Sequence, residues 1–185
     1  MPIRKLIRIV VLLTLTLMIQ IIGLPQLITG PLINMMLLIT ALILDPVSGI
    51  ILGVITPMLA LLRGQLPPVL APMVPFIMVG NAILVGVFSV IRGSRHKNIL
   101  TSVQIWIALI LASLCKTLWL FLTARFLLPL LLGRQLPELM ILAMSFPQFV
   151  TAVAGGILAL IIYELLHRRS GLPGGESNII KDNRL

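Results

Sequence analysis

The sequence predicts an all-α, polytopic integral membrane protein with six transmembrane helices and both termini in the cytoplasm. Of its 185 residues, 59% are hydrophobic and only 10% are charged, whereas about a quarter of the residues in a soluble domain are charged. Six apolar stretches approach the roughly 20 residues that a helix needs to cross a bilayer. Lys and Arg are distributed unequally between the two ends of these stretches, and this inequality predicts the orientation.

The six predicted spans form one membrane domain, residues 1–166. The first span begins with basic residues, as a signal peptide does, but no small-x-small cleavage site follows it, so we interpret it as a retained helix. The second and third spans meet at Asp45-Pro46. Proline suits the first turn of a helix but cannot continue the preceding one, which predicts a tight hairpin there, and the Asp45 carboxylate favours the amino end of the third helix. The spans cover about 6–23, 31–45, 46–62, 74–91, 99–128 and 139–165.

Basic residues predict which ends face the cytoplasm. In a six-span arrangement, ten of them fall on one side, namely Arg4, Lys5, Arg8, Arg92, Arg95, Lys97, Arg168, Arg169, Lys181 and Arg184. Three fall on the other side, namely Arg63, Arg125 and Arg134. Because cytoplasmic loops carry an excess of Lys and Arg, the first side is predicted to be cytoplasmic. It includes the tail, 167–185, which is polar and glycine-rich and is predicted to be disordered.

Small residues and prolines mark the predicted helix contacts. Helices in lipid associate by close packing of small residues, which predicts contact faces at Gly49 and Gly53 in the third span and at Ala152 and Gly156 in the sixth. Pro57 and Pro147 each free a backbone carbonyl, which requires a partner from protein or from a wet cavity. The outer loop, 63–76, contains four prolines and is predicted to be a stiff, extended connector.

Lys116 is a cation inside the fifth predicted span, well away from either end. It lies about 13 Å below Arg125, in the predicted outer half of the membrane, and a charge there costs at least a few kcal/mol. Ser113, Trp119 and Thr123 share its helical face, so this face is predicted to point into the bundle.

Neutral amides are predicted at a similar depth. Asn81 lies about 9 Å and Gln148 about 15 Å below the outer ends of their helices, while Asn34 and Gln20 also lie near outer ends. We predict a solute-binding space that opens outward. The predicted binding residues are Lys116, Asn81, Gln148, Asn34, Trp119 and Thr151.

Other roles for these residues stay open. Lys116 can snorkel outward or lose its proton, and the amides can simply bond across helices. Apart from Asp45 and Glu164 at the predicted cytoplasmic edge, far from Lys116, no acidic residue lies inside the spans. This suggests that an anionic solute supplies the counter-ion, although a neutral heterocycle held by amides fits nearly as well.

The chemistry excludes several classes of function. His96 and His167 lie at the predicted cytoplasmic margin, and the sequence has no H-E-x-x-H motif, no Ser–His couple and no paired acids at membrane depth. We therefore predict no enzyme activity, no metal and no cofactor. The net charge of +9 reflects membrane orientation, and no nucleic-acid partner is predicted. Without a phosphate-binding G-x-x-x-x-G-K-[ST] loop, the chain needs a partner to supply energy for uphill transport.

The long run from "GPLINMMLLITALILDPVSGI" to "VGNAILVGVF", together with "CKTLWLFLTARFLLPLLL" and "MSFPQFVTAVAGG", resembles the substrate-binding S component of energy-coupling factor (ECF) transporters, up to about Leu166. The resemblance implies capture of a vitamin or related micronutrient outside a bacterial cell, in a pocket of helices four to six and the outer loops. It also implies a location in the plasma membrane, and partnership with a membrane coupling subunit and two cytoplasmic ATPase subunits.

One feature departs from this family, and one alternative remains. Members often carry Ala-x-x-x-Ala on the first helix, where they dock on the coupling subunit, whereas here "IRIVVLLTLTLMIQ" offers only Thr14 and Thr16 as small docking residues. The alternative is a cell-shape scaffold of the MreD type, which is also small and polytopic but carries no cargo.

Overall fold

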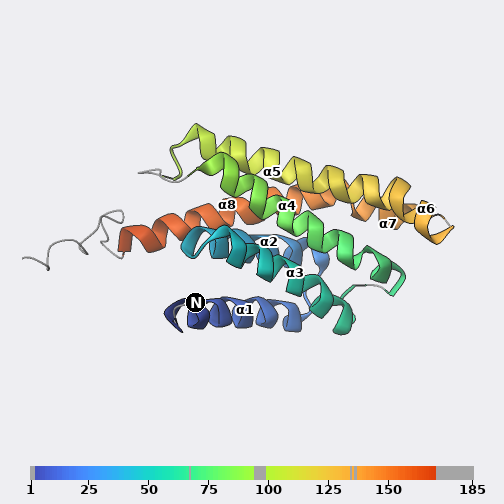
Figure 1. Ribbon diagram of the computed structural model, residues 1–185, viewed down its shortest axis with the longest axis horizontal. Helices are drawn as coiled ribbons and strands as arrows, with labels where there is room; N and C mark the ends of the chain where they lie inside the picture. Colours follow the sequence, from blue (N-terminus) through green and yellow to red (C-terminus); the bar gives the residue numbers. More distant parts are fainter. Residues whose placement is uncertain (1–2, 67, 94–98, 134, 136, 170–185) are drawn as a thin grey trace, which may run out of the picture.

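Helices make up nearly all of this computed structural model, which describes residues 3–66, 68–93, 99–133, 135 and 137–169 (Figure 1). Residues 167–169 of the tail that was predicted to be disordered are helical, and the rest of it, from residue 170 onward, lies outside the described residues. The main helices run roughly alongside one another as an elongated bundle. In chain order the helices are α1 (Ile3–Ile22), α2 (Gln26–Ile43), α3 (Pro46–Leu62), the 3₁₀ helix η1 (Pro68–Met73), α4 (Val74–Arg92), α5 (Val103–Leu122), the π-helical turn η2 (Thr123–Leu127), α6 (Leu128–Leu132), α7 (Glu138–Ala143) and α8 (Phe146–Arg169).

Five helical regions are long and apolar enough to cross a membrane, and α3 is a shorter apolar helix of 17 residues. The five regions are Lys5–Ile22, Gln26–Ile43, Leu70–Arg92, Val103–Leu132 and Glu138–Arg168. Large apolar side chains along them are exposed at the outside of the bundle. A surface of this kind suits lipid rather than water.

The predicted span boundaries need correction in three places. α2 begins at Gln26 rather than at about residue 31 and continues through Pro31. The fifth span begins at Val103, not 99, and its helix widens into η2 before α6. The sixth span is two helices, because Met144 and Ser145 interrupt it between α7 and α8. Pro147 then occupies the first turn of α8, where a missing N–H costs nothing.

The outer loop is helical rather than extended. The prediction for 63–76 relied on its prolines, but residues 68–73 wind into η1, and Leu70 and Met73 are buried there. These two side chains pack with Leu120, Ala124 and Leu128 of the α5–α6 region. Burial of apolar side chains therefore orders this loop against the end of the bundle.

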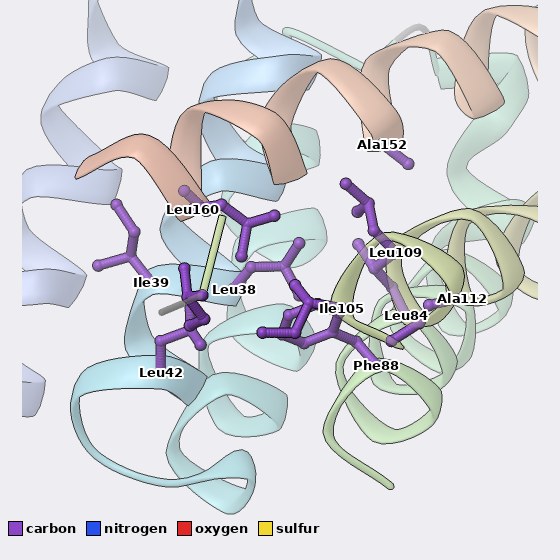
Figure 2. Packing of buried hydrophobic residues seen from close by; sticks show 13 residues of the cluster. Leu38, Ile39, Leu42, Leu84, Phe88, Ile105, Leu109, Ala112, Ala152 and Leu160 are labelled. Atoms are coloured by element: carbon purple, nitrogen blue, oxygen red, sulfur yellow. The ribbon is translucent and has the colours of Figure 1, made fainter. Parts of the chain in front are cut away.

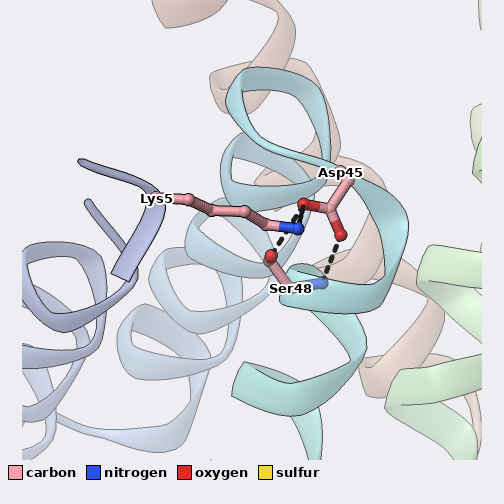
Figure 3. A network of polar contacts seen from close by, with 3 residues as sticks. All are labelled: Lys5, Asp45 and Ser48. Atoms are coloured by element: carbon pink, nitrogen blue, oxygen red, sulfur yellow. Dashed lines mark hydrogen bonds and ion pairs between the residues drawn. The ribbon is translucent and has the colours of Figure 1, made fainter. Parts of the chain in front are cut away.

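The α2–α3 turn has the geometry that Asp45 and Pro46 predict. Pro46 is the first residue of α3, and the Asp45 carboxylate caps the helix by accepting hydrogen bonds from the Ser48 N–H at 3.0 Å and the Ser48 hydroxyl at 2.9 Å. Lys5 of α1 reaches the same carboxylate at 2.7 Å (Figure 3). The start of α1 and the α2–α3 turn therefore lie at the same end of the bundle.

The bundle is centred on α2 and α8, which have the most extensive contact of any helix pair, followed by α4 with α5 and α3 with α4. Their shared core joins Leu38 and Leu42 of α2, Phe88 of α4 and Leu109 of α5 to Leu160 of α8 (Figure 2). In lipid, helices are held together by close packing and dispersion contacts, because apolar side chains gain little by leaving an apolar solvent.

Small residues lie where helices approach most closely. A Cβ at Gly49 would lie 2.9 Å from the Leu37 carbonyl oxygen, and one at Gly156 would overlap the side chain of Leu109. Ala152 is fully buried in the core. Gly155 is the tightest point in backbone terms, because a Cβ there would overlap the Pro31 carbonyl oxygen of α2 and would lie 2.9 Å from the backbone nitrogen of Met35.

α1 lies along one edge of the bundle beside α2 and α3 (Figure 1). Only 11% of its apolar stretch Lys5–Ile22 is buried. The two residues predicted to dock a partner face differently: Thr14 is exposed, whereas Thr16 is fully buried and donates to the Leu12 carbonyl at 2.7 Å. Thr16 therefore faces the bundle and is not available on the outer surface of α1.

Candidate functional site

A cavity of about 100 Å³ lies inside the bundle, among residues of α1, α2, α3, α4, α5 and the start of α8. Its lining residues come from the end of α1, the first half of α2 and the second half of α3, so it lies at the opposite end from the Asp45 turn. Half of its lining residues carry polar, uncharged side chains, and Lys116 is the single ionisable group among the described residues that line it.

Lys116 is held at the cavity wall by two amides. Its side chain is 3% exposed, and Nζ donates to Asn34 Oδ1 at 2.6 Å and to Asn81 Oδ1 at 2.8 Å. An ammonium group has three N–H donors, so one remains beyond these two bonds. The amide oxygens carry partial charge only, so they solvate the ammonium without neutralising it. Three helices, α2, α4 and α5, thus converge on one cation.

A proline in α3 helps to position Asn81. Pro57 has no N–H, so the carbonyl of Gly53, four residues earlier, lacks its intrahelical donor. Asn81 Nδ2 donates to that carbonyl at 2.9 Å. With its nitrogen committed to Gly53, the Asn81 amide presents its oxygen to Lys116. The close approach depends on the glycine, because a Cβ on Gly53 would lie 2.9 Å from the Cβ of Asn81.

The α1 side of the cavity carries two polar atoms without partners. Gln20 Nε2 donates to the backbone carbonyl of Thr56 at 2.9 Å, and Gln65 donates through Nε2 to the backbone carbonyl of Gln20. Within the described residues, however, Gln20 Oε1 and Thr56 Oγ1 are buried without a hydrogen-bond partner. Buried polar groups normally have one, so these two atoms are exceptional.

The remaining predicted residues are divided between the lining and its surroundings. Gln148 lines the cavity and donates weakly to the Ala143 carbonyl at 3.4 Å. Thr151 does not line it: its side chain packs behind Gly30, whose Cβ would lie 3.0 Å from Thr151 Cγ2. Trp119 also points elsewhere, and its indole N–H donates to the Phe76 carbonyl at 2.9 Å.

Two lining residues, Thr56 and Gln65, did not stand out in the sequence. Thr56 is a single threonine in an apolar helix, and Gln65 falls in the proline-rich loop. A threonine next to a mid-helix proline, one turn from a G-x-x-x-G motif, was the available signal for Thr56. Gln65 had none, because its role depends on how the loop folds back on α1.

No carboxylate of the described chain reaches the cavity. Asp45 is bound to Lys5, and Glu164 pairs with Arg168 at 2.9 Å, while Glu138 lies exposed at the start of α7. Over the same part of the chain, no three His, Cys, Asp or Glu side chains come together as metal ligands would. The arrangement is therefore chemically suited to binding, with one cation, several amides and hydroxyls, and a small cavity.

Comparison with known proteins places this arrangement in a family. Residues 4–167 match the family described as the ECF transporter, substrate-specific component. No curated protein and no solved structure matches the chain. The family match covers nearly all of the described helices and agrees with the resemblance seen in the sequence. A polytopic helical chain with a buried polar cavity and this family signature belongs to the substrate-specific components of ECF transporters.

Proposed function

We propose that the cavity around Lys116 binds a vitamin or related micronutrient from outside the cell. In this proposal the six helices span a bacterial plasma membrane with both termini in the cytoplasm, so that the cavity end faces outward. Energy for uptake comes from partners, a membrane coupling subunit and two cytoplasmic ATPase subunits. The family match supports the role of a substrate-binding transport component.

The convergence of Asn34, Asn81 and Lys116 is the observation that carries the proposal. A buried cation is costly in a membrane protein, and intramembrane charges usually mark solute paths or binding sites. Here three helices direct polar side chains to one point beside a cavity. A purely packed bundle gains nothing from this arrangement, because apolar side chains would fill the same volume at lower cost. The MreD-type scaffold is therefore the less favoured function.

The test is native mass spectrometry of the full chain, released gently from detergent. A carrier purified from cells that supply its solute should show a mass surplus from a retained small molecule, and Lys116→Met should abolish it. Arg125→Met is the matched control, because Arg125 is an exposed cation outside the cavity lining. If neither the wild-type nor the control protein retains a compound or takes one up in cells, the transport role is wrong. Retention unchanged by Lys116→Met would remove Lys116 from the site.

A further inference from the structure

We propose that the cavity selects a small molecule with an acidic group at one end and a hydrogen-bond donor at the other. This inference rests on the proposed function of the cavity as the solute site. The acidic group would meet Lys116, and the donor would meet the unpartnered oxygens of Gln20 and Thr56. Two separate observations support it, one at each end.

The Lys116 end lacks a counter-ion within the described chain. Asn34 and Asn81 solvate the ammonium through their oxygens, but the described acidic side chains are paired or exposed elsewhere. The third N–H of the ammonium remains available. A carboxylate offers both the negative charge and the acceptor atoms that this position lacks, and hydrogen bonds between charged partners are the stronger kind.

The Gln20 end needs a donor. Gln20 Oε1 is an amide oxygen and can only accept a hydrogen bond, and its residue is 4% exposed. Thr56 Oγ1 belongs to a residue that is 1% exposed, and it too has no partner in the described structure. Both residues line the cavity, and the Gln20–Thr56 hydrogen bond of 2.9 Å keeps them adjacent. Both oxygens are shielded from solvent, so leaving them unsatisfied is costly, and an N–H or O–H donor of a solute that reached them would remove that cost.

The two ends are close together. Thr56 follows Gly53 by three residues on α3, a rise of about 4.5 Å, and Gly53 contacts Asn81, which contacts Lys116. The cavity volume of about 100 Å³ is also below the range of about 300–1,000 Å³ that holds drug-sized ligands. These dimensions fit a single small ring or a short chain that bears both groups.

Matched synthetic probes test both ends. Pyrrole-2-carboxylate, pyrazole-3-carboxylate and imidazole-4-carboxylate each combine an acid with a ring N–H, and each has a carboxamide and an N-methyl counterpart. Binding to the full chain in nanodiscs would be measured by equilibrium dialysis. We expect at least one carboxylate to bind, with its carboxamide about 10- to 100-fold weaker and its N-methyl form about 10-fold weaker, from the strengths of charged and neutral hydrogen bonds.

Two threonine variants test whether the solute donor meets the Thr56 hydroxyl. Thr56→Val removes the unpartnered hydroxyl in the cavity, and Thr117→Val removes another buried hydroxyl without a partner that lies outside the lining. We expect Thr56→Val to weaken the N–H probe several-fold while leaving its N-methyl form unchanged, and Thr117→Val to change neither.

Three outcomes would overturn the inference: carboxamides that bind as tightly as the acids, N-methyl forms that bind as tightly as the N–H forms, or no binding by any of the nine probes. The proposed function is judged separately, by the mass surplus of the purified protein. A retained compound without an acidic group would therefore refute the selectivity and leave the transport role intact.

Discussion

Asn81 donates through Nδ2 to the carbonyl oxygen of Gly53 at 2.9 Å, and so replaces a hydrogen bond that α3 cannot make for itself. The cause is Pro57, which has no N–H to offer. The same amide then accepts from Lys116. The hydrogen bond that α3 lacks at Pro57 is thereby connected to the position of Lys116, the one cation among the described cavity residues, and this connection can be tested.

Pro57→Ala should weaken solute binding without weakening the fold. Alanine restores an N–H that competes with Asn81 for the Gly53 carbonyl, and it removes a proline penalty of up to about 3 kcal/mol inside a helix. We expect an unchanged or higher unfolding temperature together with loss of retained compound in native mass spectra. A lower unfolding temperature would show that Pro57 itself is needed for packing.

Gly53→Ala should destabilise the protein by about 1–3 kcal/mol, the usual cost of overpacking. Its new Cβ would lie 2.9 Å from the Asn81 Cβ and would push α3 away from α4. Gly86→Ala is the control within α4, because nothing lies within 4 Å of the position of its Cβ. The control should be neutral or slightly stabilising, since alanine favours helix. Thermal unfolding of both variants checks this, and equal losses would contradict it.

Asn34→Asp should give Lys116 a counter-ion from the protein itself and thereby weaken solute binding. The aspartate would lie at the position of an oxygen that Lys116 already contacts at 2.6 Å, and it would supply the charge that we assign to the solute. We expect retained folding and at least a tenfold loss of binding, about 1.4 kcal/mol. Asn34→Leu removes the acceptor without adding charge and should destabilise the fold instead. Tighter binding in the Asp variant would indicate a cationic solute.

Acid should weaken the attachment of α1 through Asp45. Burial of the Asp45 carboxyl favours a higher pKa, but hydrogen bonds from Lys5 and Ser48 outweigh it and hold the pKa below its usual value of 3.8. The ionised form thus stabilises the folded state above pH 3.8, and this contribution is lost as the pH falls through the lowered pKa.

Two variants separate the charge from the cap. Asp45→Asn keeps a good helix cap, so it should lose only about 0–1 kcal/mol at neutral pH and should no longer show the Asp45 component of acid sensitivity. Asp45→Ala should lose about 1 kcal/mol more. Unfolding temperatures at pH 7 and pH 3 measure both effects. An Asn variant as acid-sensitive as the wild type would place the acid response at another group.

Much of the site follows from depth and helical face. Lys116, Asn81, Asn34 and Gln148 were expected at one level of the membrane, and all four line the same cavity. The expectation that Pro57 frees a backbone carbonyl that needs another donor agrees with the Asn81–Gly53 hydrogen bond, although only the fold shows which residues form it.

The rest depends on details that a linear pattern does not contain. Trp119 shares the Lys116 face by spacing, yet it does not line the cavity, and its indole N–H donates to the Phe76 carbonyl. Thr16 and Thr14 are two residues apart and therefore point to different sides of α1. The proline-rich loop was expected to be extended because proline favours that conformation, but burial of Leu70 and Met73 wound it into η1.

The contact at Gly155 affects how the molecule can move. There the backbone of α8 meets the backbone of α2 with no side chain between them, so we expect these two helices to behave as a rigid body. Within the described residues, the side-chain polar contacts between α1 and other helices lie near its two ends, at Lys5 with Asp45 and at Gln20 with Thr56. We therefore expect admission of a solute to require hinging of α1 away from an immobile α2–α8 frame.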